Sequence, residues 1–70
     1  MEFGKLFKQA RIDCGYTQKY VAEKLGIHQS NVSDWENNVS RPEYEKLIEL
    51  ALMYGLTIEE LLDVGQKFKF

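Results

Sequence analysis

Apolar residues recur along this chain at the spacing of α-helices rather than of β-strands. The first such stripe has the spacing i, i+4, i+7, i+11 and consists of Phe3, Phe7, Ala10 and Cys14. A stripe of this kind is the buried face of a helix, so all four side chains are expected to face the core, Cys14 as a small buried hydrophobe. Gly15 follows where a helix commonly ends. Strand-like alternation occurs only at residues 68–70.

The second and third predicted helices are short and meet across a glycine. Thr17 occupies an N-cap position, because its side-chain oxygen can accept a hydrogen bond from a backbone N–H of the first turn. Gly26 permits the positive φ that a sharp turn requires. The third helix runs from about Gln29 to Asn37. The apolar residues that are expected to pack the two helices together are Val21, Ala22, Leu25, Ile27, Val32 and Trp35.

A fourth helix is predicted after Pro42 and ends at Gly55. A capping box, Thr57-x-x-Glu60, opens a fifth. Their inward apolar residues are Leu47, Leu50, Ala51, Tyr54, Ile58, Leu61 and Leu62. We therefore predict a compact all-α domain of five helices over residues 1–63. Residues 64–70 form a tail that is expected either to contact a second copy or to be disordered.

Length and composition restrict the class of protein. Seventy residues of 8.2 kDa provide one small core. The single cysteine cannot form an internal disulfide, and the single histidine, His28, cannot build a metal site. A lone cysteine suits a reducing compartment, and no apolar run approaches the roughly 18 residues of a membrane helix. We expect a cytoplasmic protein that self-associates and has no membrane partner.

The charge is unevenly distributed along the chain. The net charge is −2, which alone argues mildly against nucleic-acid binding. Residues 1–41 carry six basic and five acidic side chains, whereas residues 42–70 carry three lysines and six acids. Binding to phosphates depends on the local face rather than on the total, so the first part of the chain is the candidate binding region.

Catalytic chemistry is not indicated. The sequence has no glycine-rich phosphate loop and no Ser-His-Asp or Cys-His set. Two carboxylates for acid–base work would need a shared cleft, and we expect five short helices to offer none of useful size. We therefore predict that the protein is not an enzyme, needs no cofactor or metal, and has no evident small-molecule ligand.

The segment from Arg11 to Pro42 carries the most specific pattern. It reads Arg11-x-x-x-Gly15-Tyr16-Thr17-Gln18, then Val21-Ala22-x-x-Leu25-Gly26-Ile27, then Val32-Ser33-x-Trp35-Glu36-Asn37, then Arg41-Pro42. This pattern resembles the phage lambda repressor/Cro-type (XRE-like) helix-turn-helix family over about residues 3–63. The resemblance implies a five-helix fold with the third helix in the major groove of DNA. It also implies a sequence-specific transcriptional regulator, a repressor, that binds a palindromic operator as a homodimer.

The resemblance also implies residue roles. Residues matching base-contacting positions are Gln29, Ser30, Asn31 and Asp34, and those matching phosphate-contacting positions are Gln18, Lys19, Asn37 and Arg41. Arg11 and Glu36 match an ion pair that ties the first helix to the third. A glutamine amide can bond bidentately to adenine, and the amides of Gln18 and Gln29, eleven residues apart, can brace each other.

Four positions depart from the family pattern and leave a second function open. His28 stands where a capping Ser or Thr is usual, and Glu43 also replaces a usual capping Ser. Asn38 replaces a common glycine, although asparagine tolerates the left-handed region. Asp34 places an acid on the reading side of the third helix. Together with the acidic total, Asp34 favours the alternative of an antitoxin-like or anti-repressor protein-interaction module on the same scaffold.

Overall fold

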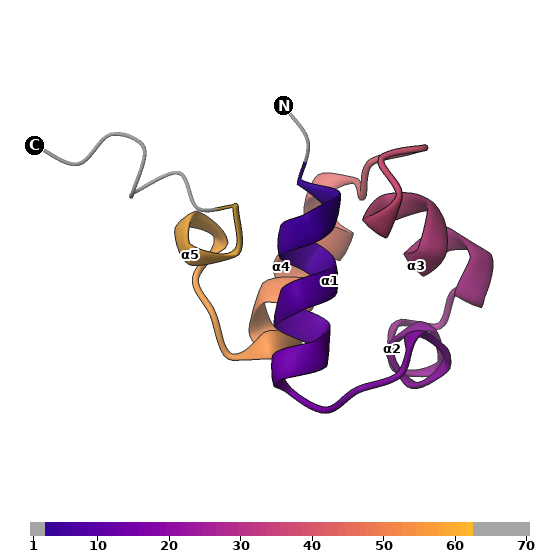
Figure 1. Cartoon of the computed structure of the whole chain (residues 1–70), viewed down its shortest axis with the longest axis horizontal. Coiled ribbons are helices and arrows are strands. Elements are labelled where there is room, and N and C mark those ends of the chain that lie inside the picture. The colour runs from indigo at the N-terminus through magenta and orange to yellow at the C-terminus, as the bar shows by residue number, and fades with distance from the viewer. Residues whose placement is uncertain (1–2, 63–70) are drawn as a thin grey trace, which may run out of the picture.

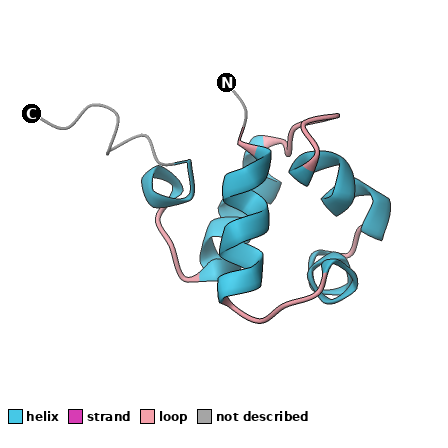
Figure 2. Cartoon of the chain, viewed as in Figure 1, coloured by secondary structure: helices cyan, strands magenta, loops and turns pink. Residues whose placement is uncertain are grey.

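The computed structural model describes residues 3–62, and over this range it has five helices and no strand (Figures 1 and 2). The helices are α1 (Gly4–Asp13), α2 (Gln18–Leu25), α3 (Gln29–Glu36), α4 (Tyr44–Tyr54) and α5 (Ile58–Leu62). The predicted all-α fold of five helices is therefore confirmed. Residues 64–70, for which the sequence left two alternatives, lie outside the described part of the chain.

The helix ends follow the predicted local chemistry. Thr17 Oγ1 accepts a hydrogen bond from Tyr20 N at 3.0 Å, and Gly26 closes α2 with a φ of 69°. The capping box of α5 is formed in both directions, because Thr57 N donates to Glu60 Oε1 at 2.9 Å and Glu60 N donates to Thr57 Oγ1 at 3.0 Å. The third helix is one residue shorter than predicted, with Asn37 as its C-cap.

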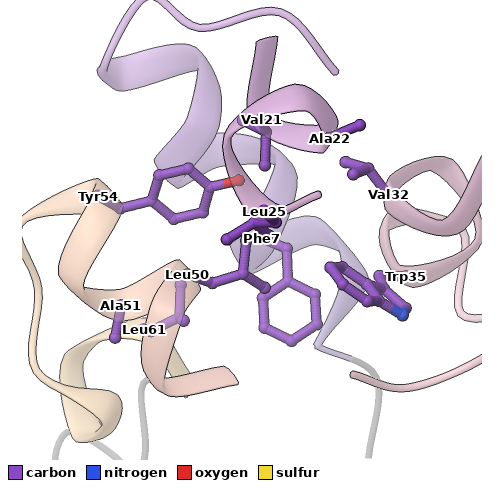
Figure 3. Close-up of a cluster of buried hydrophobic side chains, with 10 residues drawn as sticks. All are labelled: Phe7, Val21, Ala22, Leu25, Val32, Trp35, Leu50, Ala51, Tyr54 and Leu61. Carbon is purple, nitrogen blue, oxygen red and sulfur yellow. The ribbon is translucent and has the colours of Figure 1, made fainter. Parts of the chain in front are cut away.

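One core holds the helices together (Figure 3). Val21 and Val32 are almost completely buried where α2 meets α3, and Leu50 and Leu61 are equally buried where α4 meets α5. The other members of the cluster are Phe7, Ala22, Leu25, Trp35, Ala51 and Tyr54. Burial of such side chains stabilises a fold by about 1.5–3 kcal/mol each. The core thus fixes α3 against α1 and α2.

The prediction that Cys14 is buried is wrong. Cys14 is the C-cap residue of α1 and its side chain is exposed. The helix ends at Asp13, so the apolar stripe of α1 stops at Ala10, one turn earlier than the spacing suggested. The thiol Sγ lies 3.6 Å from the carbonyl oxygen of Tyr54, to which it donates a weak hydrogen bond.

A close backbone approach joins the start of α1 to the end of α3. Gly4 is buried, and its N–H donates to the side-chain Oδ1 of Asn38 at 2.9 Å. A Cβ placed on Gly4 would lie 2.8 Å from the carbonyl carbon of Glu36. Asn38 has a φ of 62°, so it adopts the left-handed conformation predicted for it. The contact requires glycine at position 4, which the apolar spacing did not reveal.

Candidate nucleic-acid interface

The α2–α3 unit presents one exposed helix surface. Val32 and Trp35 bury one side of α3, which leaves Gln29, Ser30 and Asn31 exposed at its start. His28 precedes the helix and makes no side-chain cap hydrogen bond, as its replacement of Ser or Thr suggested. Figure 1 shows α2 and α3 together on one side of α1, away from α5. The first turn of α3 is therefore accessible to a partner.

A buried ion pair locks α3 to α1, as predicted. Arg11 Nε donates to Glu36 Oε2 at 2.7 Å and Nη2 donates to Oε1 at 3.1 Å, while the two side chains are 12% and 3% exposed. Arg11 Nη1 also donates to the carbonyl oxygen of Tyr16 at 2.8 Å. The hydrogen bond to Glu36 raises the pKa of Arg11, with desolvation opposing it. The pair is bidentate, a geometry that fixes orientation as well as distance.

A series of hydrogen bonds continues from this pair to the exposed start of α3. Gln18 Nε2 donates to Glu36 Oε1 at 3.0 Å, and Gln29 Nε2 lies 3.4 Å from Gln18 Oε1. The expected contact between the two amides is thus present in the structure, although it is long. The bond from Gln18 to Glu36 was not expected from the sequence. It connects the buried carboxylate to the side chain of Gln29.

The fourth candidate for base contact, Asp34, is placed differently from the other three. It is half-buried, and its carbonyl oxygen accepts from Val39 N at 2.9 Å and Ser40 N at 3.4 Å. Asp34 therefore anchors the loop that follows α3, whereas Gln29, Ser30 and Asn31 are exposed. The structure does not bring Asp34 together with them as a fully accessible group.

The candidates for phosphate contact also differ in their availability. Lys19 and Arg41 are exposed, and Gln18 is half-buried at the start of α2. Asn37 is exposed, but its Nδ2 donates to the carbonyl oxygen of Ser33 at 2.9 Å and to Ser33 Oγ at 3.2 Å. Its side-chain donors are therefore used within α3. Of the four candidates, Lys19 and Arg41 are the exposed cations.

Arg41 also stands at the edge of a hollow of about 350 Å³, which corrects the expectation that no cleft of useful size exists. The hollow lies among apolar side chains of α1, α3, α4 and α5. Its lining residues are Phe3, Phe7, Trp35, Asn38, Ser40, Arg41, Pro42, Leu47 and Leu62. Among the lining residues in the described part of the chain there is no carboxylate, imidazole or thiol, and Ser40 supplies the one hydroxyl.

Tyr54 is a polar neighbour of the ion pair that the sequence did not indicate. Its ring extends from α4 into the core with the hydroxyl directed inward (Figure 3). The hydroxyl has no hydrogen-bond partner within residues 3–62. Burial raises the pKa of Tyr54, and the negative charge of Glu36 adds to the increase. Sequence patterns treat Tyr54 as an apolar core residue, so they contain no signal for this polar atom.

Residues 7–61 match the family model described as helix-turn-helix. The chain belongs to the Cro/C1-type helix-turn-helix family. It is 40% identical over 62 residues to the HTH-type transcriptional regulator ImmR of Bacillus subtilis, covering 89% of this chain and 49% of that protein. It is 34% identical over 62 residues to the HTH-type transcriptional activator BcrR of Enterococcus faecalis, covering 89% of this chain and 30% of that protein.

The chain therefore spans about half the length of one relative and less than a third of the other. The family consists of DNA-binding regulators rather than enzymes, as the sequence predicted. In the part of the chain that the structure covers, no helix is long and apolar enough to cross a membrane.

Proposed function

We propose that this chain is a sequence-specific transcriptional regulator in the cytoplasm that places α3 in the major groove of double-stranded DNA and binds a palindromic operator as a homodimer. The observation that carries the proposal is the position of Gln29, which is exposed at the start of α3 and contacts Gln18, itself bonded to the buried Glu36. The relatives are named as a regulator and an activator, which supports control of transcription in general.

The direction of the hydrogen bonds that join Glu36, Gln18 and Gln29 supports readout of adenine. A carboxylate only accepts hydrogen bonds, so Gln18 must turn its NH₂ group toward Glu36 and its carbonyl oxygen toward Gln29. Gln29 then uses one N–H for that oxygen and retains its own Oε1 and a second N–H. One acceptor beside one donor complements the N6 amino group and N7 of adenine. We therefore expect an A·T pair opposite Gln29 in each half-site.

The expected phosphate contacts follow from which side-chain donors are exposed and still free to bond. Lys19 and Arg41 can pair with backbone phosphates directly, and Gln18 keeps one N–H of its amide for a phosphate. Asn37 would first have to turn its amide away from Ser33. Ser30 and Asn31 reach base edges beside Gln29, and Asp34 contributes least because it is half-buried.

The test is selection of binding sites from a randomised DNA pool by the wild type, Gln29→Ala and a matched control, Gln9→Ala. Gln9 is an exposed glutamine of α1 whose Nε2 donates to Asp13 Oδ1 in its own helix. Loss of Gln29 should weaken binding by about 1–3 kcal/mol and relax preference at one base pair of each half-site, whereas the control should enrich the wild-type operator. Arg41→Ala should weaken binding to all sequences and flatten the salt dependence.

Two results would contradict the proposal. If Gln29→Ala enriches the same operator with the same preference at every position, Gln29 does not read a base. If the folded wild type enriches no sequence, the protein-interaction module that the net charge of −2 and Asp34 favour becomes the better explanation.

A further inference from the structure

The hollow beside Arg41 has the size and the apolar walls of a site for a small ligand. Its volume is about 350 Å³, and three of its lining residues are aromatic: Phe3, Phe7 and Trp35. The rings of Phe3 and Phe7 are tilted with their centroids 6.4 Å apart, and Figure 3 shows the side chains of Phe7 and Trp35 next to each other. Ligand pockets typically measure roughly 300–1,000 Å³. The hollow is therefore large enough for a compact ligand that contains one ring.

The polar groups that line the hollow belong to one short segment and offer hydrogen-bond donors. They are supplied by Asn38, Ser40 and Arg41. Asn38 Oδ1 already accepts from Gly4 N at 2.9 Å, so the NH₂ group is what this side chain has left to offer. The Ser40 hydroxyl can donate, and a guanidinium only donates. A ligand that enters the hollow is expected to carry acceptors on the side that meets this segment.

The charge of the lining favours an anion. Arg41 is exposed, is the one charged lining residue in the described part of the chain, and forms no ion pair with another residue of the range 3–62. A cationic ligand would meet this guanidinium without finding a carboxylate partner in the wall. A guanidinium binds a carboxylate through two parallel hydrogen bonds, which gives both strength and orientation. Charge complementarity therefore selects a carboxylate.

We propose that the hollow binds a small aromatic carboxylate, with its ring among Phe3, Phe7 and Trp35 and its carboxylate on Arg41. An aromatic ring gains from tilted contacts with aromatic walls in addition to its burial. The bound carboxylate occupies the guanidinium that otherwise pairs with a DNA phosphate, so the ligand weakens DNA binding. This competition rests on the proposed function, whereas the ligand site itself does not.

The first experiment titrates phenylacetate into the whole chain at constant ionic strength and follows the NMR signal of the Trp35 indole N–H. Trp35 is the single tryptophan and lines the hollow, so this signal reports on the site. For a ligand of this size we expect a dissociation constant of about 1 mM. Phenylethanol, which keeps the ring but has no charge, and acetate, which keeps the charge but has no ring, should each bind about tenfold more weakly or worse.

Two variants test the role of Arg41 in this binding. Arg41→Gln removes the cation from the hollow, and the matched control Lys19→Gln removes an exposed cation of α2 that does not line it. Arg41→Gln should weaken phenylacetate binding about tenfold, whereas Lys19→Gln should leave it unchanged. Far-UV circular dichroism confirms that each variant is folded. The inference is overturned if phenylacetate does not shift the Trp35 signal of the wild type, or if Arg41→Gln binds it as tightly as the wild type.

Two other occupants of the hollow give distinct results, and each would overturn the inference. If phenylacetate shifts the Trp35 signal only after Phe68 and Phe70 are both replaced with alanine, residues 63–70 of the same chain fill the hollow. If the Trp35 signal moves with protein concentration in the absence of phenylacetate, a second copy of the chain fills it.

DNA titrations test the competition and separate it from the proposed function. At about ten times its dissociation constant, phenylacetate should reduce the DNA affinity of the wild type to that of Arg41→Gln, relative to equal sodium acetate, which matches the ionic strength. It should also weaken DNA binding by Lys19→Gln and leave that of Arg41→Gln unaffected. An unchanged DNA affinity of the wild type overturns the competition. If the wild type binds no DNA but phenylacetate still shifts Trp35, the proposed function is wrong and the ligand site stands.

Discussion

Replacing Gly4 with alanine tests whether the close approach of α1 to α3 matters for stability. The added Cβ would lie 2.8 Å from the Glu36 carbonyl carbon and 2.9 Å from Asn38 Oδ1, and closer still to the Glu36 carbonyl oxygen. The main obstacle is the backbone of α3, which cannot swing aside as the end of a side chain can. The start of α1 must therefore shift away from the end of α3.

The expected magnitude follows from three contributions. Overpacking of a filled site costs about 1–3 kcal/mol. The shift also breaks the hydrogen bond from Gly4 N to Asn38 Oδ1, which contributes about 0.5–1.5 kcal/mol. Alanine recovers at most about 1 kcal/mol through its better helix propensity. We expect a net loss of about 2 kcal/mol, which is large for a domain whose total stability is about 4–10 kcal/mol.

Urea unfolding followed by Trp35 fluorescence and far-UV circular dichroism measures this loss. Trp35 is the single tryptophan and is buried in the core, so its emission reports on global unfolding. With a slope of about 1 kcal/mol per molar urea, the midpoint of Gly4→Ala should fall by about 2 M. Lys5→Ala, an exposed change in the same turn, is the control and should move little. A midpoint for Gly4→Ala equal to or above that of the control would refute the reasoning.

Two further predictions concern the buried polar groups. Arg11→Ala should lower the free energy of unfolding by about 3 kcal/mol, because it leaves the buried Glu36 carboxylate without its cation. The control, Lys8→Ala, changes an exposed residue and should have little effect. Equal melting temperatures for the two variants would contradict this prediction. Tyr54→Phe should not destabilise the fold at pH 7, because the hydroxyl has no partner within residues 3–62. Above pH 10 the unfolded chain releases the Tyr54 proton, whereas the folded chain retains it because the pKa of Tyr54 is raised there. The stability of the wild type should therefore fall as the pH rises. The stability of Tyr54→Phe should fall less steeply, because the variant lacks this proton. If the stability of the wild type and of Tyr54→Phe falls equally steeply above pH 10, this contribution of Tyr54 is wrong.

The sequence predicted the features that depend on local spacing. The buried faces of α2 and α3, the Thr17 cap and the capping box of α5 all follow from residues within one or two helical turns. The Arg11–Glu36 pair was also predicted, but from the resemblance to a family rather than from spacing, because its partners are 25 residues apart.

Features set by tertiary contact could not be predicted in the same way. Cys14 continues the apolar period of α1, but the helix has already ended, so its side chain turns to the surface. Gly4 is required by the backbone of α3, which no pattern within α1 encodes. The exposed apolar side chains of α4 were missed for a related reason: Tyr44 and Leu52 resemble core residues, and only their exposure in the folded chain shows that the core does not use them.

The buried ion pair is better explained by orientation than by stability. Replacing a buried pair with well-packed apolar residues is often neutral or stabilising, so burial of Glu36 does not by itself indicate a stabilising role. An apolar residue at position 36 could fill the same space, but it could not accept the amide of Gln18. The Gln18 carbonyl oxygen would then no longer be directed toward Gln29, and Gln29 could present either end of its own amide to a base. We infer that the charge of Glu36 defines which hydrogen-bonding groups α3 offers at its exposed end.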